Sequence, residues 1–174
     1  MLILVDANVI IELHLVERWE VYTREHSVAI PQIIAKEALF SDSGDIRRKR
    51  IAEITQNAIT SGNILEFSAD EEELLRLNEH FDDLFLENIH AGEYEALALL
   101  LTNRCQEYNF CSADAVALRA AAMLGLSDRC VCLDNTLREI GYQCSLSHQF
   151  CQDFMDRCLT QGSQDLITGL GMRR

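Results

Sequence analysis

The chain has 174 residues, of which 48% are hydrophobic and 25% are charged, and its formal net charge is −13 at pH 7. This length suits one globular domain that buries a core without a disulfide or a metal ion to hold it together. The acidic balance argues against a general nucleic-acid coat protein, because phosphate contacts dominate such binding. It does not exclude a nuclease whose acidic residues hold cations.

Five short apolar runs alternate with longer helical patterns along the chain. The runs predicted as strands are LILV (2–5), SVAI (27–30), NILEF (63–67), NFCSA (109–113) and CVCL (130–133). The segments predicted as helices are 8–19, 32–40, 45–60, 69–81, 82–88, 92–105, 115–125, 135–141 and 147–161. Alternating strands and helices favour a parallel sheet that is covered on both sides. We therefore predict an α/β three-layer sandwich with a short four- to five-stranded parallel sheet and helices on both faces.

Residues 1–145 are predicted to form the domain, and residues 146–174 a helical extension packed on it, with the last dozen residues loose. The chain has no run of about 18 or more apolar residues, so no membrane span is expected. The segment MLILVDANVII has no basic region before its apolar residues, and Asp6 and Asn8 interrupt it, so we do not predict a signal peptide. The expected location is the cytoplasm.

The cysteines are odd in number and include no CxxC pair, which favours reduced, mostly structural thiols. The seven are Cys105, Cys111, Cys130, Cys132, Cys144, Cys151 and Cys158. A zinc site of His148, Cys151 and Cys158 is an alternative. The two thiols are seven positions apart in a helical pattern, however, which favours a shared core-facing stripe.

One dense basic cluster stands out in this acidic chain, formed by Arg47, Arg48, Lys49 and Arg50 near the start of the predicted helix 45–60. Such a cluster is either a solvated helix face or a patch that contacts the phosphates of RNA.

Aspartates follow three of the predicted strands, namely Asp6, Asp114 and Asp134. Ligands of open parallel sheets bind beyond the carboxyl ends of the strands, so these three side chains are candidates for a common site. Each also precedes a helix, where aspartate is a good N-cap. Asp6 is harder to explain as a cap, because Asn8 stands closer to the start of the predicted helix.

The sequence contains none of the GxGxxG, GxxxxGK[ST] or GxSxG motifs of nucleotide cradles and nucleophile elbows. The five histidines show no paired spacing, and each is read as a surface or satisfied helix residue: His14, His26, His80, His90 and His148. Carboxylates that converge without histidine or cysteine suit Mg²⁺ or Mn²⁺, which prefer oxygen ligands.

Four segments together resemble the PIN-domain family, the metal-dependent ribonuclease fold of VapC-type toxins, with a more distant likeness to the flap-endonuclease superfamily. LILVDANVII resembles the first strand of the family, which implies that Asp6 is a metal ligand and that Asn8 steadies it. AIPQIIAKEALF resembles the segment that carries the second acid, which we place at Glu37.

The other two segments carry the remaining acids that the resemblance implies. GEYEALALL places Glu93 at the ligand position, with Glu95 as the second candidate, and NFCSAD places Ser112 and Asp114. On an ideal helix two residues that are two positions apart point about 200° away from each other, so helix geometry alone allows only one glutamate to face the site. An E-x-E pair of the flap-endonuclease type implies that both can serve metals.

The resemblance implies an endoribonuclease that cleaves RNA with a metal-activated water, with Asp6, Glu93 and Asp114 as ligands and Glu37 completing the pocket. It also implies homodimerisation and, for a toxin, a small antitoxin protein as partner. The alternative is a non-catalytic binding or regulatory protein on the same fold, which the charge of −13 favours. A phosphatase is a third possibility, and it is disfavoured because position 8 is Asn, so that the usual D-x-D is absent.

Overall fold

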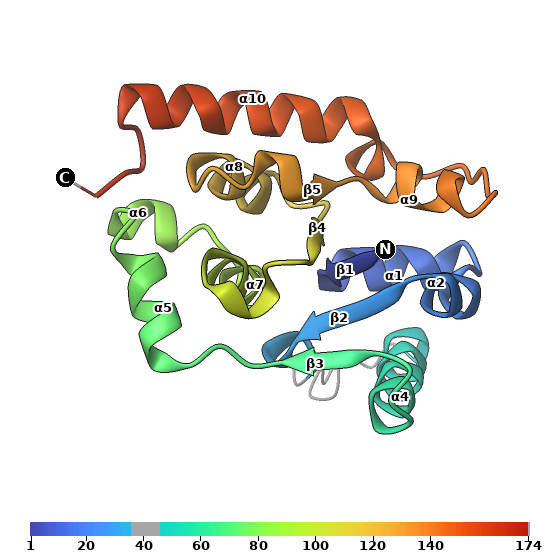
Figure 1. Ribbon diagram of the computed structural model, residues 1–174. Coiled ribbons are helices and arrows are strands. Elements are labelled where there is room, and N and C mark those ends of the chain that lie inside the picture. The colour runs from blue at the N-terminus through green and yellow to red at the C-terminus, as the bar shows by residue number, and fades with distance from the viewer. Residues whose placement is uncertain (36–45, 174) are drawn as a thin grey trace.

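A computed structural model describes residues 1–35 and 46–173, apart from the side chains of residues 46–48 and 103. Its five strands form one parallel sheet in the order β3-β2-β1-β4-β5 (Figure 1). The strands are β1 (Leu2–Val5), β2 (Ser27–Pro31), β3 (Leu65–Phe67), β4 (Asn109–Cys111) and β5 (Cys130–Val131). All five predicted strands are confirmed, although β3, β4 and β5 are shorter than the apolar runs that predicted them.

Successive residues of the central strands enter two separate cores, one on each face of the sheet. Leu4, Ala29 and Phe110 belong to one core, and their neighbours Val28 and Cys111 belong to the other. This alternation follows from the two-residue period of a strand, and burial on both sides explains why these strands are apolar throughout.

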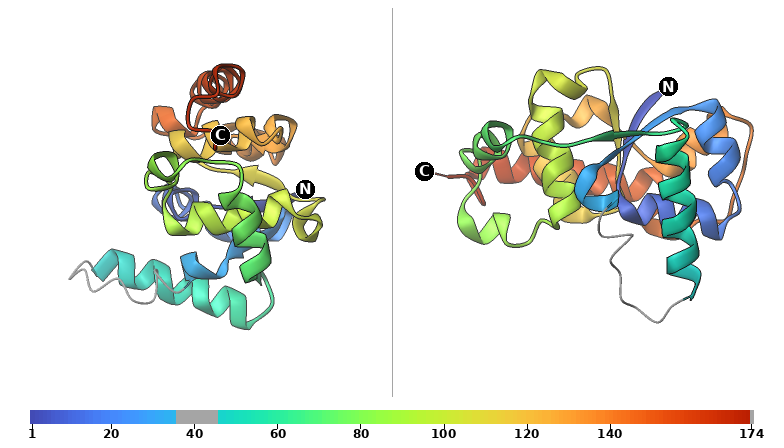
Figure 2. Two further views of the ribbon diagram at one scale, coloured as in Figure 1. Left: turned by 90° about the vertical axis from the view of Figure 1, so that its left-hand side faces the viewer. Right: turned by 90° about the horizontal axis from the view of Figure 1, so that it is seen from below.

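Helices cover both faces, which confirms the three-layer sandwich (Figure 2). One layer contains α5 (Glu71–Asn78), α6 (Asp83–Leu86), α7 (Ala91–Leu101) and α8 (Ala115–Met123), with α10 (Gln152–Thr168) packed on α8. The other layer contains α1 (Ala7–Leu15), α2 (Trp19–Glu25), α4 (Ile46–Thr60) and α9 (Leu133–Glu139). Single 3₁₀ turns lie at η1 (Asn103–Cys105), η2 (Ser127–Arg129) and η3 (His148–Phe150). Within the described ranges no helix combines the length and the apolar character that a membrane crossing requires.

The prediction of one helix over residues 8–19 is wrong, because the chain turns between α1 and α2. Glu17 adopts a left-handed backbone conformation with φ of 57°, which an α-helix cannot contain. The turn brings the buried ring of Trp19 back onto His14, with 5.0 Å between the ring centroids. Burial of Trp19 therefore accompanies the break in the helix.

Packing against α8 fixes α10 along most of its length (Figure 1). A Cβ atom at Gly162 would overlap the backbone carbonyl of Arg119, so the two helices approach at a point where only glycine fits. Nearby, the guanidinium of Arg119 pairs with the buried carboxylate of Asp165 at 2.7 Å. A glycine contact and a buried ion pair together hold the C-terminal helix on the domain.

The expectation that the last dozen residues are loose is also wrong. The helix continues to Thr168, and the chain beyond it pairs with the segment before α6. The amide of Asp82 donates to the carbonyl of Gly171 at 2.9 Å, and Phe81 and Met172 form an antiparallel bridge. These backbone hydrogen bonds hold the tail in place through Arg173. The sequence did not indicate this, because the helical periodicity ends before the tail.

Candidate metal site

The candidate site lies where the strand order changes direction, between the carboxyl ends of β1 and β4. From β1 the chain proceeds to β2 on one side, and β4 later joins on the other side, which makes this the switch point at which open α/β sheets bind ligands. Asp6 follows β1 directly and Asp114 follows β4. The N-terminal end of α7 brings Glu93 to the same place.

Asp6 is fully buried, and three hydrogen bonds hold its carboxylate. Its Oδ1 accepts from the amide of Val9 at 2.8 Å, and its Oδ2 accepts from the hydroxyl of Ser112 at 2.5 Å and the amide of Ala113 at 3.1 Å. Burial raises the pKa of Asp6, these hydrogen bonds oppose that rise, and the charge on Asp114 adds to it. A buried carboxylate of this kind favours a nearby cation.

Asp6 is the N-cap of α1, so the expectation that Asn8 is the better-placed cap is wrong. The extended backbone of Asp6, with φ of −88° and ψ of 173°, places its carboxylate at the amide of Val9. Asn8 is exposed in the first turn of α1. The hydrogen bonds that steady Asp6 thus come from Val9, Ser112 and Ala113.

Ser112 connects the two aspartates. Its hydroxyl donates to Asp6 Oδ2 and accepts from the amide of Asp114 at 3.1 Å. Asp114 in turn caps α8 through Oδ1 alone, which accepts from the amides of Val116 and Ala117 at 2.8 Å each. The cap therefore uses one carboxylate oxygen of Asp114 and leaves Oδ2 facing the N-terminal end of α7.

Glu93 lies in the first turn of α7 and is buried. Gly92 before it packs so closely that a Cβ atom there would overlap the side chain of Ile34. Burial, followed by the negative charges of Asp114 and Asp6, raises the pKa of Glu93 to about 7. The negative charges of Asp6, Glu93 and Asp114 therefore oppose one another at this point, and the imidazole of His90 partly offsets the rise in the pKa of Glu93.

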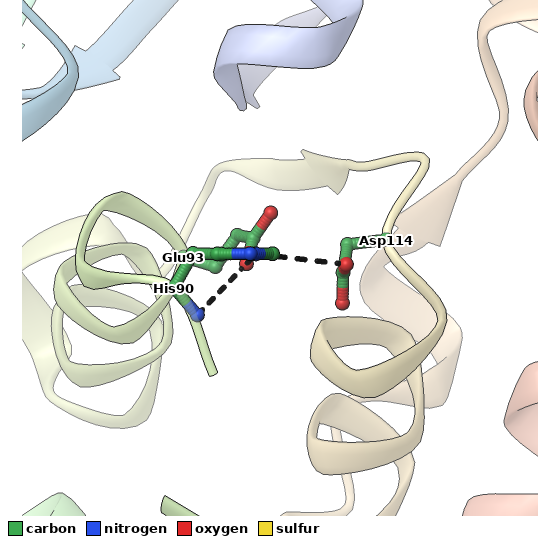
Figure 3. Close-up of side chains that lie close together, drawn as sticks. All are labelled: His90, Glu93 and Asp114. Carbon is green, nitrogen blue, oxygen red and sulfur yellow. Dashed lines mark hydrogen bonds and ion pairs between the residues drawn. The ribbon is translucent and has the colours of Figure 1, made fainter. Parts of the chain in front are cut away.

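His90 completes the cluster at the N-cap position of α7 (Figure 3). Its Nδ1 lies 2.9 Å from Glu93 Oε2 and 3.8 Å from Asp114 Oδ2. One ligand atom from each of His90, Glu93 and Asp114 lies within 4.8 Å of the others, so this group can hold a metal ion. His90 is exposed, in agreement with its prediction as a surface residue. Its position three residues before Glu93 does not by itself indicate a site, and only the approach of Asp114 from α8 reveals the cluster.

Glu95 points elsewhere, although it leaves the same turn of α7. Its Oε2 accepts from the amide of Ile33 at 2.8 Å, after β2, and its Oε1 accepts from the amide of Ala69 at 3.1 Å, after β3. The side chain is buried, and it joins α7 to two neighbouring strand ends. The structure thus brings Glu93 to His90 and Asp114, and Glu95 to backbone amides.

Some predicted residues lie away from the cluster or outside the described residues. Glu37 lies outside the described residues, as do the side chains of Arg47 and Arg48. Lys49 and Arg50 are exposed on α4, and Arg50 lines a surface hollow of about 520 Å³ beside the end of α1.

Asp134 is neither a cap nor a member of the cluster. It lies in the first turn of α9, where it pairs with Arg138 at 2.8 Å. All seven cysteines are free thiols. Within the described part of the chain, only the cluster at α7 brings histidine, cysteine or acidic residues close enough together to hold a metal ion. His148, Cys151 and Cys158 therefore do not form such a group.

A comparison of the chain with protein-family models, curated proteins and solved structures finds no match. The PIN-domain resemblance therefore remains a prediction from the four sequence segments. The positions of the site's residues are therefore the main basis for proposing a function.

Proposed function

We propose that the protein is a divalent-metal-dependent endoribonuclease that cleaves RNA phosphodiesters. The observation that carries the proposal is the grouping of Glu93 and Asp114 with His90 at the switch point of the sheet, with Asp6 linked to Asp114 through Ser112. Burial, followed by the charges of Asp114 and Asp6, raises the pKa of Glu93 there. Carboxylates placed so closely are costly without a cation, and a cation would balance them.

The residues present fit Mg²⁺ or Mn²⁺, which take oxygen ligands from carboxylates. Asp114 keeps Oδ2 outside its cap, and Glu93 keeps Oε1 outside its contacts with His90. An ionised carboxylate has about four acceptor positions, and the hydrogen bonds of Asp6 use three, so Asp6 retains one on Oδ1. Glu37 stays in the proposal as a further acid of the pocket.

The bound cation would lower the pKa of a water molecule and stabilise charge on the scissile phosphate. The chain's own contribution is to hold its ligands in place before the substrate arrives. Backbone amides of Val9 and Ala113 orient Asp6, and those of Val116 and Ala117 orient Asp114. Ligands fixed by amides on helix ends and strand ends are preorganised, which a catalytic site requires.

RNA as the substrate rests on the PIN-domain resemblance and on the exposed Lys49 and Arg50 of α4. These side chains, with Arg47 and Arg48, would contact the phosphate backbone. A homodimer, and an antitoxin partner if the nuclease is a toxin, belong to the same proposal.

A non-catalytic binding protein is the second candidate, and one observation favours it. Asp6 and Asp114 both cap helices, so a purely structural role explains their position as well. Glu93 also has a structural role, because it closes the capping box of α7 by accepting from the amide of His90. Its raised pKa means that keeping this buried carboxylate ionised costs stability at neutral pH, which a structural role alone does not require.

The test compares Glu93→Gln and Asp114→Asn with Asp134→Asn, a matched change of a strand-end aspartate outside the cluster. Each purified variant is incubated with labelled single-stranded RNA and Mn²⁺, and its folding is checked by circular dichroism. We expect cleavage by the wild type and by Asp134→Asn, and background cleavage by the two cluster variants. Absence of both cleavage and saturable Mn²⁺ binding in the wild type would support the binding protein instead.

A further inference from the structure

The cluster at α7 contains a nitrogen donor beside its carboxylates. His90 Nδ1 lies between Glu93 Oε2 at 2.9 Å and Asp114 Oδ2 at 3.8 Å (Figure 3). Its imidazole is three-quarters exposed, with 75% of the side-chain surface accessible, so solvent and ions reach the ring. A cation that binds the two carboxylates would therefore also meet this nitrogen, which is a ligand in the tautomer that carries its proton on Nε2; a proton held between Nδ1 and Glu93 is released to solvent on binding.

The kind of ligand decides which cation a site prefers. Mg²⁺ favours oxygen ligands and keeps several waters, whereas imidazole suits first-row transition ions. For a mixed nitrogen and oxygen site, affinity rises along the first-row series from Mn²⁺ onward. An imidazole added to two or three carboxylates thus shifts a site that would accept Mg²⁺ toward transition ions.

His90 also has a second relationship to Glu93 that must be separated from ligation. The backbone amide of His90 donates to Glu93 Oε2 at 3.2 Å, next to the contact that the ring makes with the same oxygen. A ring that only positioned Glu93 would affect every divalent cation equally. A ring that acts as a ligand would affect transition ions more than Mg²⁺.

We propose that His90 is a ligand of the metal site and that it makes the site prefer Mn²⁺ and other first-row transition ions to Mg²⁺. The inference rests on the proposed function only in that both require a cation at Glu93 and Asp114. His90 thereby has a role in metal selection that its sequence context did not predict.

The informative variant is His90→Asn. Asparagine is a favoured N-cap residue, so α7 should still begin at the same place. Its side-chain amide offers both a donor and an acceptor near the position of Nδ1, so it can replace the contact with Glu93 in either tautomer while the imidazole is lost. His148→Asn is the matched control, because His148 is an exposed histidine on the 3₁₀ turn η3.

Titration calorimetry with Mn²⁺ alone and with Mg²⁺ alone gives the affinity ratio for each variant. We expect His90→Asn to lower the ratio of Mn²⁺ to Mg²⁺ affinity about tenfold, and His148→Asn to leave it unchanged. Pulsed electron paramagnetic resonance of bound Mn²⁺ should show coupling to a ligand nitrogen in the wild type and in His148→Asn, and none in His90→Asn.

Two results would overturn the inference. In one, His90→Asn weakens both ions equally; in the other, nitrogen coupling persists without His90. The variant Asp114→Asn distinguishes failure of the role of His90 from failure of the proposed function. If that variant loses Mn²⁺ binding while His90→Asn retains the wild-type ratio, the metal site stands and the role of His90 does not. A wild type with no saturable Mn²⁺ binding overturns both.

Discussion

Glu93 and Glu95 leave the same turn of α7 and reach the ends of different strands. Glu93 meets His90 and the charge of Asp114 after β4, whereas Glu95 accepts hydrogen bonds from the amides of Ile33 and Ala69 after β2 and β3. One glutamate is surrounded by other acids and the other by backbone donors. Removal of the charge of Glu93 should therefore stabilise the fold at neutral pH, whereas removal of the acceptor oxygens of Glu95 should destabilise it.

Replacement of Glu95 by alanine should destabilise the fold. The change leaves the half-buried amides of Ile33 and Ala69 without their acceptor, and an unsatisfied amide costs about 1–3 kcal/mol when fully buried and less where water reaches it. We expect the free energy of unfolding in urea to fall by about 3 kcal/mol. Glu71→Ala, at an exposed position of α5, serves as the control and should change it little. An equal effect of the two substitutions would show that these hydrogen bonds do not matter.

Replacement of Glu93 by glutamine should alter how stability depends on pH. The pKa of Glu93 is raised from 4.5 to about 7 in the folded protein, so the folded state retains a proton that the unfolded state has released between these values. The stability that this proton provides is present at low pH and is lost as pH rises through about 7. Glutamine cannot ionise and avoids that loss.

The measurement is urea unfolding of both proteins with a chelator, from about pH 5 to about pH 8. Over this range we expect Glu93→Gln to gain on the order of 2 kcal/mol relative to the wild type. The difference between the two proteins cancels the titration of other groups, such as His14, whose burial lowers its pKa to about 4. A difference that is constant across the range would contradict the raised pKa.

Mn²⁺ should stabilise the folded protein through the same cluster. An ion that binds only the folded state at about 100 times its Kd adds about 2.7 kcal/mol, which for a domain of this size raises the melting temperature by roughly 5–10 °C. We expect this rise in the wild type and in Asp134→Asn, measured by differential scanning calorimetry. Asp114→Asn should melt at the same temperature with and without Mn²⁺.

A methyl group at Gly162 should separate α10 from α8. The Cβ atom of Gly162→Ala would overlap the carbonyl of Arg119, and this overpacking in a buried contact costs about 1–3 kcal/mol. Ser163→Ala, at the exposed neighbouring position, is the control. Thermal unfolding should place Gly162→Ala several degrees below both the control and the wild type. Since α8 carries Asp114, Mn²⁺ affinity measured well below the melting temperature tests whether α10 also steadies the site.

The central strand β1 could be predicted from sequence because burial on both faces makes Leu2–Val5 continuously apolar, whereas the edge strand β3, with Glu66 and no buried residue, carries a weaker signal. The strand-end aspartates followed from the same pattern. The turn at Glu17 could not be predicted, because it accompanies the burial of Trp19 in the core, a tertiary contact that local periodicity does not contain. The choice between Glu93 and Glu95 depends on which amides surround each side chain, and that is likewise a tertiary property.

His90 was missed for a different reason. Its neighbours in the cluster are Glu93, which lies three residues after it in α7, and Asp114, which lies 24 residues after it in the chain. Only the pairing of α7 with α8 brings the second of these into reach. A histidine three residues before an acid at a helix start is common enough in sequences that the spacing alone predicts no site.

The helix cap of α7 and the candidate ligand set share a carboxylate, since Glu93 Oε2 accepts from the amide of His90 and faces its ring, while Oε1 lies outside these contacts. An ion that draws this carboxylate toward itself would loosen the amide's hydrogen bond. The backbone amide of His90 is thus a natural reporter, whose proton resonance and exchange rate should change with occupancy before any substrate is present. Nuclear magnetic resonance of this single amide would report when a metal ion occupies the site, without a label on the metal-binding side chains.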